Sequence, residues 1–201
     1  MAISTYAELQ TAVANWLKRS DLTSYLADLI TVGETRIFRE LRTKDLETAF
    51  STAISSGTIA TPTSYLDLKF TYVNASPVRR LKRRSAAWIY ENYPTRAAEG
   101  KPAFIAREGS TFIFGPYPDS NYTVAGVYYK NIGPLSSSAH AAFTNNPDLY
   151  LYAALIAAEP FIKNDKRLPM WEMQYQNILK LANQQDRSEE YSGSSMEVTP
   201  G

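Results

Sequence analysis

The densest group of reactive side chains in the sequence is cationic. In the stretch 78-VRRLKRRS-85, five of six consecutive positions carry Lys or Arg: Arg79, Arg80, Lys82, Arg83 and Arg84. Such side chains neutralise nucleic-acid phosphates or pair with carboxylates of another protein, and they also protect exposed sheet edges from aggregation. The run therefore leaves three interpretations open: a DNA contact, a protein contact, or a solvated edge strand.

The charge of the whole chain weighs on this choice. The 201 residues include 21 Lys and Arg and 20 Asp and Glu, which gives a net charge of +1. Proteins that bind nucleic acid through its phosphates usually carry a positive excess, because counterion release supplies much of the affinity. Trp88 and Tyr90 could stack on bases, but their spacing fits the packing face of a short helix better. A solvated edge is the favoured interpretation of the run.

Catalytic residue combinations are scarce. The single histidine, His140, lies in a stretch of small residues, where we expect an ordinary surface position. The chain has no cysteine, so disulfides and thiolate metal sites are excluded, and Ser/His or Cys/His nucleophiles are disfavoured. No carboxylate pair stands out as a glycosidase site, and there is no Gly-rich phosphate loop. We predict no enzymatic activity, no cofactor and no metal.

The first part of the chain predicts two helices. Thr5 and Glu8 have the spacing of a capping box, and apolar residues follow at helical intervals. A second amphipathic pattern runs from Leu22 to Leu41. Because the link between the two patterns is short, we expect an antiparallel pair.

The middle of the chain predicts antiparallel strands. It is rich in Thr, Val, Ile, Phe and Tyr, and Gly and Pro divide it into short runs. A hairpin is expected around Glu108 and Gly109, and a short helix from Ser85 to Tyr93 with Ala86, Trp88, Ile89 and Tyr90 on its packing face. Alternation predicts two sets of residues that each share one strand face, namely Leu66, Leu68, Phe70 and Tyr72, and Tyr122, Val124, Gly126 and Tyr128.

The last third returns to a helical pattern. Asn146 can cap a helix that has Pro147 at its first position, and Pro160 should kink this helix. A final helix is predicted from Pro169 to Arg187. Residues 188–201 are polar and rich in Gly and Ser, which is typical of a flexible arm.

These elements predict an α+β fold. Residues 1–45 and 145–187 would form an antiparallel four-helix bundle from the N- and C-terminal helix pairs. Residues 46–144 would form an inserted antiparallel β-rich lobe with one short helix, and residues 188–201 an extended C-terminal arm. No apolar run is long enough for a membrane span, and the N-terminus lacks the pattern of a signal peptide.

The helical pattern of the last third also resembles a known family. The string 146-NPDLYLYAALIAAEPFIKNDKRLPMWEMQYQNIL-179 is similar to the last helices of phage head-to-tail adaptor proteins, the tail tubular protein A-like family. Asn164 departs from the acidic residue that is common in the family. The stretches TYAELQTAVANWL, 34-ETRIFRELR-42 and 101-KPAFIAREGSTFIFGPYPDSNYTVAGVYYKNIGPLS-136 agree with the family in the same order.

The resemblance implies a structural virion protein of the capsid–tail neck, made in the host cytoplasm. Such adaptors form dodecameric rings on the portal protein, extend the DNA channel, and offer a platform to the tail nozzle (tail tubular protein B-like) or other tail proteins. Double-stranded DNA would pass without specific binding. The expected portal or subunit contacts are Arg36, Arg39, Arg42, Tyr191, Met196 and Val198, with Arg79, Arg80, Lys82, Arg83 and Arg84 as a channel or inter-subunit patch.

Two other functions stay open from the sequence. One is a packaging accessory protein that binds DNA directly, and it requires salt-dependent binding by the isolated protein. The other is a cell-wall hydrolase carried in the neck, and it requires a specific catalytic carboxylate. Balanced charge disfavours the first, and the missing site pattern disfavours the second.

Overall fold

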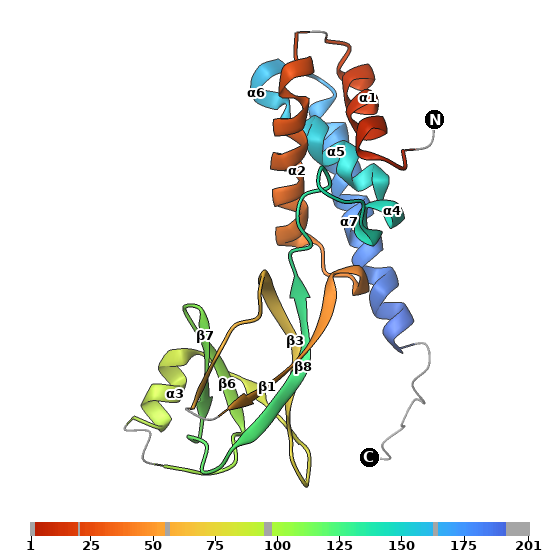
Figure 1. Cartoon of the computed structure of the whole chain (residues 1–201). Helices are drawn as coiled ribbons and strands as arrows, with labels where there is room; N and C mark the ends of the chain where they lie inside the picture. The colour runs from red at the N-terminus through yellow and green to blue at the C-terminus, as the bar shows by residue number, and fades with distance from the viewer. Residues whose placement is uncertain (1–2, 20, 55–56, 95–97, 163–164, 192–201) are drawn as a thin grey trace, which may run out of the picture. The chain divides into compact units, whose positions relative to one another are not determined.

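The computed structural model describes the chain except residues 1–2, 20, 55–56, 95–97, 163–164 and 192–201 (Figure 1). It confirms the predicted α+β class. The chain separates into two compact units: unit 1 comprises Met1–Leu46 and Ile132–Gly201, and unit 2 comprises Glu47–Asn131. Residues 132–144, which we expected in the β-rich part, fall in unit 1.

The described part of unit 1 is helical. Its α-helices are α1 (Tyr6–Leu17), α2 (Leu26–Glu40), α4 (Ala141–Asn145), α5 (Pro147–Ala157), α6 (Glu159–Ile162) and α7 (Leu168–Tyr191), with 3-10 turns at Thr23–Tyr25 and Lys44–Leu46. The capping box of α1 is confirmed: the Thr5 hydroxyl accepts from the Glu8 N–H at 3.2 Å, and the Glu8 carboxylate accepts from the Thr5 N–H at 3.0 Å.

Helix α5 lies at the centre of unit 1 and contacts α1, α2 and α7 (Figure 1). It buries side chains on all sides, as expected for a helix without a polar face: Leu149, Tyr150, Leu151, Ala153, Ala154 and Leu155. Helix α2 approaches it closely at Gly33, where a Cβ atom would lie 2.9 Å from the backbone of Ala153 and Ala154. The regular four-helix geometry stays a prediction.

Two helix boundaries and one helix cap in unit 1 differ from the prediction. Helix α2 begins at Leu26 because the preceding residues form a 3-10 turn. Pro160 does not kink one helix but lies in a second, short helix, because α5 has already ended at Ala157. Asn146 occupies the N-cap position of α5, yet its side chain donates to the Ala142 carbonyl at 3.2 Å instead of capping.

Glu34 of α2 is a buried carboxylate, only 4% exposed. Its Oε1 accepts a hydrogen bond from the Leu135 N–H at 2.7 Å, which fixes the segment before α4 against α2. Burial raises the pKa of Glu34 above its ordinary value of 4.5, against the opposing effect of this hydrogen bond. Its contribution to stability is therefore complete below pH 4.5 and is lost as the pH rises through the raised pKa.

Replacing Glu34 by Gln keeps the acceptor oxygen and removes the charge. We expect Glu34→Gln to raise the free energy of unfolding at pH 7 by on the order of 1 kcal/mol and to leave it unchanged at pH 4. Urea titrations at both pH values measure this. The control is Glu34→Ala, which leaves the Leu135 N–H without its acceptor and should destabilise by about 1–3 kcal/mol. A Gln variant less stable than the native chain at pH 7 would contradict the expectation.

The described part of unit 2 contains two four-stranded sheets and one helix. The first sheet has the order β1 (Glu47–Ile54), β8 (Tyr122–Lys130), β3 (Tyr65–Asn74) and β4 (Arg79–Arg80). The second has the order β2 (Thr58–Ala60), β7 (Thr111–Gly115), β6 (Phe104–Glu108) and β5 (Lys82–Arg83), with α3 spanning Ala86–Asn92. Side chains from both sheets form one core: Ile54, Ile59, Leu68, Val73, Leu81, Ile105, Phe112, Phe114, Val124 and Tyr128.

We predicted antiparallel strands throughout unit 2, and one pair differs. Strand β5 pairs with β6 in parallel. The reason is the connection, because α3 lies between β5 and β6 and returns the chain to the end from which β5 started, as parallel pairing requires. The predicted β6–β7 hairpin is confirmed, with Gly109 at φ 59° in its turn.

Strand β3 contradicts the predicted alternation. Its pairing with β8 is irregular between Leu68 and Phe70. Beyond this bulge, Thr71 and Val73 are buried, whereas Phe70 is 40% exposed and stacks on Tyr72. The four residues expected on one face are therefore divided between two faces, because the bulge shifts the two-residue period by one position.

Helix α3 buries one residue fully, Ile89. Trp88 packs against Phe104, with ring centroids 4.7 Å apart. Tyr90, which we expected on the packing face, is exposed, and its hydroxyl donates to the Glu108 carboxylate at 2.9 Å. A helix of two turns covers too little of the sheet to bury every apolar residue that it carries.

Candidate functional site

The cationic run 79–84, which we call the basic crossover, passes from one sheet of unit 2 to the other. Arg79 and Arg80 pair with β3, and Lys82 and Arg83 pair with β6. Between them Leu81 is only 5% exposed and its N–H donates to the Thr71 carbonyl at 2.9 Å. The buried leucine fixes the segment, so the cationic side chains on both sides of it are exposed.

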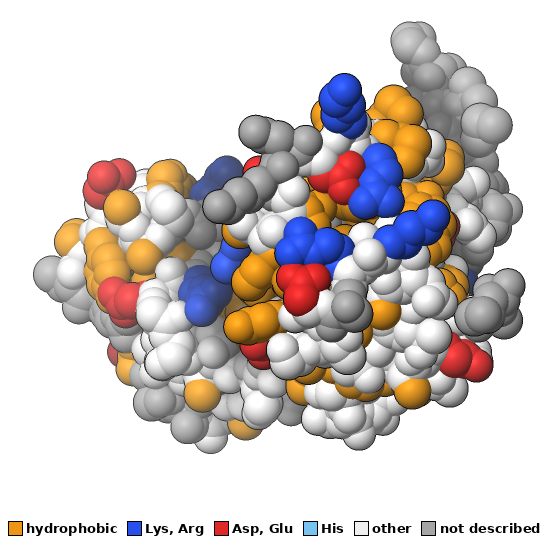
Figure 2. Space-filling view, turned by 90° about the horizontal axis from the view of Figure 1, so that it is seen from above, with side chains coloured by type: hydrophobic (Ala, Val, Ile, Leu, Met, Phe, Trp, Pro, Cys, Tyr) orange, Lys and Arg blue, Asp and Glu red, His pale blue; other side chains and the backbone are white. Residues whose placement is uncertain are grey.

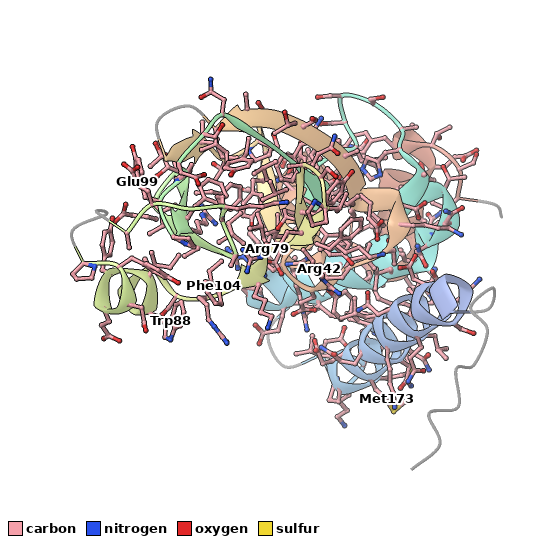
Figure 3. The ribbon with its side chains drawn as sticks, turned by 90° about the horizontal axis from the view of Figure 1, so that it is seen from below. Arg42, Arg79, Trp88, Glu99, Phe104 and Met173 are labelled. Carbon is pink, nitrogen blue, oxygen red and sulfur yellow. The ribbon has the colours of Figure 1, made fainter. Side chains whose placement is uncertain are left out.

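The five cations of the basic crossover differ in their partners. Arg83 lies 2.6 Å from the Asp67 carboxylate, whose hydrogen bond raises the pKa of Arg83. Arg79 donates to the Lys101 carbonyl at 3.1 Å, and the Arg84 guanidinium lies 5.3 Å from the Trp88 ring centroid. Figure 3 labels Arg79, Trp88 and Phe104 in this region.

The side chains of Arg80 and Lys82 are exposed and make no hydrogen bond or ion pair with the other residues that the structure describes. They line a shallow groove of about 440 Å³, together with Leu68, Lys69, Phe70, Thr71, Leu81, Arg83 and Arg84. Trp88 is packed against Phe104 and covered by Arg84, which disfavours base stacking. The free cations in this groove are suited to an anionic partner.

The two units differ in charge. Unit 2 has ten Lys and Arg against six Asp and Glu, a net charge of +4. Unit 1 has eleven against fourteen, a net charge of −3. The overall charge of +1 therefore conceals a chain with a cationic and an anionic unit. On the face shown in Figure 2, Lys and Arg side chains lie among Asp, Glu and hydrophobic ones rather than in one continuous positive area.

Two of the three predicted interface arginines, Arg36 and Arg42, make contacts inside the chain. Both Nη atoms of Arg36 contact the Glu172 carboxylate, at 2.8 and 2.5 Å, and its guanidinium lies 4.2 Å from the Tyr175 ring centroid. Arg42 donates to the Phe38 carbonyl at 3.0 Å, near the end of α2. Arg39 is exposed. The side chain of Tyr191, and all of Met196 and Val198, lie outside the described residues.

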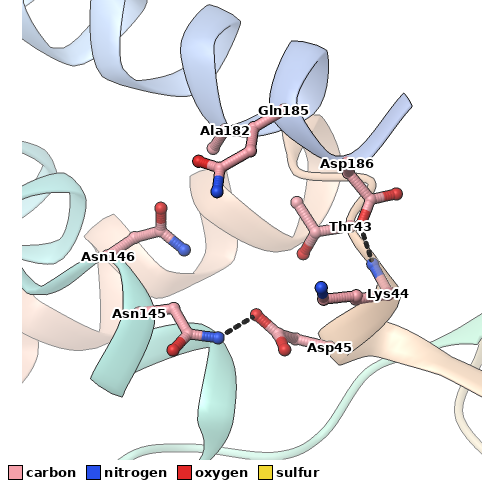
Figure 4. Close-up of a pocket in the computed structure, with 8 residues that line it drawn as sticks. All are labelled: Thr43, Lys44, Asp45, Asn145, Asn146, Ala182, Gln185 and Asp186. Carbon is pink, nitrogen blue, oxygen red and sulfur yellow. Dashed lines mark hydrogen bonds between the residues drawn. The ribbon is translucent and has the colours of Figure 1, made fainter. Parts of the chain in front are cut away.

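A polar pocket of about 310 Å³ lies in unit 1 and was not predicted (Figure 4). It is lined by Thr43, Lys44, Asp45, Asn145, Asn146, Ala182, Gln185 and Asp186. Asp45 accepts from Asn145 Nδ2 at 2.9 Å, and Asp186 accepts from the Lys44 N–H at 2.7 Å. These residues come from three segments that are distant in the sequence, so no local sequence pattern predicts the pocket.

A family model described as SU10 adaptor protein matches residues 4–199, which include nearly all of both units. The chain belongs to the SU10 adaptor protein family. It is thus a phage adaptor with a structural role in the virion, and the predicted resemblance to head-to-tail adaptors is confirmed. No curated protein matches the sequence.

In this SU10 adaptor protein, His140 has a structural position rather than the ordinary surface position that we expected. It is half-buried, and its Nδ1 accepts from the Phe143 N–H at 3.3 Å at the start of α4. Burial lowers the pKa of His140, which keeps the ring neutral and able to accept. Across the described residues, no cluster of three or more His, Cys, Asp or Glu side chains could hold a metal ion. Within the same residues, no helix is long and apolar enough to cross a membrane.

The contacts of Arg36 predict an effect on the stability of the isolated SU10 adaptor protein. We expect Arg36→Ala to lower the free energy of unfolding by about 1 kcal/mol, because it breaks a partly exposed ion pair and uncovers Tyr175. Arg39→Ala on the same helix is the matched control and should change stability by less than about 0.5 kcal/mol. Urea unfolding followed by circular dichroism checks both, and equal effects would contradict the assignment.

Proposed function

We propose that this protein is a head-to-tail adaptor that assembles as a ring on the portal vertex, extends the DNA channel and provides the attachment platform for the tail. The match of the SU10 adaptor family to residues 4–199 carries the proposal. Its partners are the portal protein, further copies of the same chain, and a tail nozzle or other tail protein. Double-stranded DNA passes through without specific binding.

The basic crossover acts in this proposal as a protein contact. Arg80 and Lys82 have free charges, but the chain as a whole is nearly neutral. A ring repeats each patch once per copy, so even two free cations become a belt of positive charge. Binding of such a belt to anionic groups of neighbouring proteins needs no positive excess of the whole chain.

The first test is the mass in solution, by light scattering, of the purified protein alone and mixed with the portal protein of the same phage. We expect a ring-sized complex with the portal. Absence of any complex would overturn the proposed assembly on the portal. Truncation after Tyr191 in the same assay tests the proposed contact of the C-terminal arm, which should weaken portal binding without unfolding either unit.

A second candidate function is direct DNA binding, which the charge of +4 on unit 2 favours. It predicts binding of the free protein to plain duplex DNA with an affinity that falls steeply with salt. The variant Arg80→Glu/Lys82→Glu separates the two functions. If it retains portal assembly and loses only DNA binding, DNA is the partner of the basic crossover. The control Lys18→Glu/Lys166→Glu reverses two exposed charges of unit 1.

A further inference from the structure

The polar pocket of unit 1 is rich in unused acceptors. Asp45 uses Oδ2 for Asn145, and Asp186 uses Oδ1 for the Lys44 N–H. The other oxygen of each carboxylate has no hydrogen-bond partner among the described residues. Carboxylates only accept hydrogen bonds, so the complementary ligand group is a cation with several N–H donors.

Thr43 gives an independent indication of a missing ligand. It is only 4% exposed, and its Oγ1 is buried without a hydrogen-bond partner in the described chain. Figure 4 shows this hydroxyl turned toward the space beside Asp45 and Asn145. A buried hydroxyl without a partner is unfavourable. A polar ligand that enters the pocket would supply one.

The complementary group is present on the same chain, in unit 2. The side chains of Arg80 and Lys82 in the basic crossover are exposed, donate to no described residue, and belong to the cationic unit. We infer that the polar pocket of one copy receives Arg80 and Lys82 from the basic crossover of a second copy. This inference rests on the proposed ring, since a ring of identical chains needs two different patches that fit each other.

The inference specifies the charges of the contact. Asp45 and Asp186 bring two negative charges, and Lys44 brings one positive charge to the same pocket. The side chains of Arg80 and Lys82 would therefore enter a pocket with a net negative charge. Such charge complementarity favours this pair of surfaces over others. Both sets of side chains reach solvent. The affinity of the contact should therefore fall as the salt concentration rises and screens the charges.

Two variants disable one half of the contact each. Asp45→Asn/Asp186→Asn, the pocket variant, removes both charges but keeps an acceptor oxygen for Asn145 and for the Lys44 N–H. Arg80→Gln/Lys82→Gln, the crossover variant, neutralises two exposed side chains. Neither variant can extend a ring with itself, but a mixture retains one complete contact, between the pocket of the crossover variant and the crossover of the pocket variant.

The experiment is an NMR titration of the full-length chain at low salt. When the ¹⁵N-labelled crossover variant is mixed with the unlabelled pocket variant, we expect chemical-shift changes at Thr43–Asp45 and Asp186. The reverse labelling should move the resonances of residues 79–84. Each variant mixed with itself should bind at least about tenfold more weakly. Chemical-shift mapping also detects weak association in fast exchange, so a weak contact is not missed.

No shift in either labelling scheme, or shifts confined to other surfaces, would overturn the inference. This result is distinguishable from failure of the proposed function, because portal binding is measured separately by light scattering with the unmodified chain. If the chain binds the portal but the shifts are absent, the proposed function stands and the proposed contact between copies is wrong. The shifts without portal binding would support the contact between copies and overturn the proposed assembly on the portal.

Discussion

We expect the replacement of Trp171 by Ala to lower the free energy of unfolding of unit 1 by about 3–5 kcal/mol. Trp171 is 0% exposed and is the largest fully buried side chain in the described part of the chain. Together with Tyr175 and Leu179 it forms the buried stripe of α7, which packs on α5. Its indole Nε1 has no hydrogen-bond partner in the described chain. The loss therefore comes from lost packing, from the cavity and from the contact with the Arg167 guanidinium, 4.8 Å from the ring centroid, with no broken hydrogen bond to add.

Chemical denaturation followed by far-UV circular dichroism measures this loss. The matched control is Met173→Ala, on the same helix but 54% exposed, which should change stability by less than about 0.5 kcal/mol. Figure 3 shows Met173 on the outer side of α7. A loss of less than about 1 kcal/mol for Trp171→Ala would contradict the packing of α7 described above.

The second large effect is expected in unit 2 at Gly126. A Cβ atom at this position of β8 would lie 2.3 Å from the Phe70 carbonyl oxygen and 2.7 Å from Thr71 Cγ2. The first of these atoms belongs to the backbone of the bulged strand β3 and cannot move without disturbing the β3–β8 pairing. We expect Gly126→Ala to lower the stability of unit 2 by about 2–3 kcal/mol.

Gly100→Ala is the control for this substitution. There the nearest atom, Pro116 Cγ, is 3.4 Å from the added Cβ, and the backbone has no positive φ. NMR peak intensities of unit 2 amides in a urea titration report the unfolding midpoint of that unit, because total tryptophan fluorescence also contains Trp16 and Trp171 of unit 1. Equal midpoints for the two alanine variants would show that β3 yields freely and that the bulge does not depend on the glycine.

Sequence patterns predicted the features that depend on near neighbours. The capping box at Thr5 and the turn at Gly109 follow from the local backbone and formed as expected. The bulge in β3 did not, because no residue between Leu68 and Phe70 requires it. Its cause is the glycine of another strand, Gly126, which admits the displaced backbone.

For the candidate sites too, the sequence predicted what is local and missed what depends on contacts between distant segments. The basic crossover is contiguous in the sequence, so it was visible as a cationic patch, and the buried Leu81 explains why its charges are exposed. The interface prediction for Arg36 used its place in a family pattern, whereas its ion pair with Glu172 arises only when α2 and α7 meet. In the polar pocket, Asp45 and Asn145 are a hundred positions apart in the sequence. Only the folded chain brings them together, so the sequence could not predict the pocket.

The division of unit 1 into two segments determines the order in which the chain can fold during synthesis. Glu47 pairs with Tyr129, so unit 2 begins and ends at neighbouring positions of one sheet and is a closed insertion. Helices α1 and α2 leave the ribosome first, but their apolar faces are covered by α5, which follows only after all of unit 2. Co-translational folding should therefore begin in the middle of the chain, and the earliest helices wait for the latest ones.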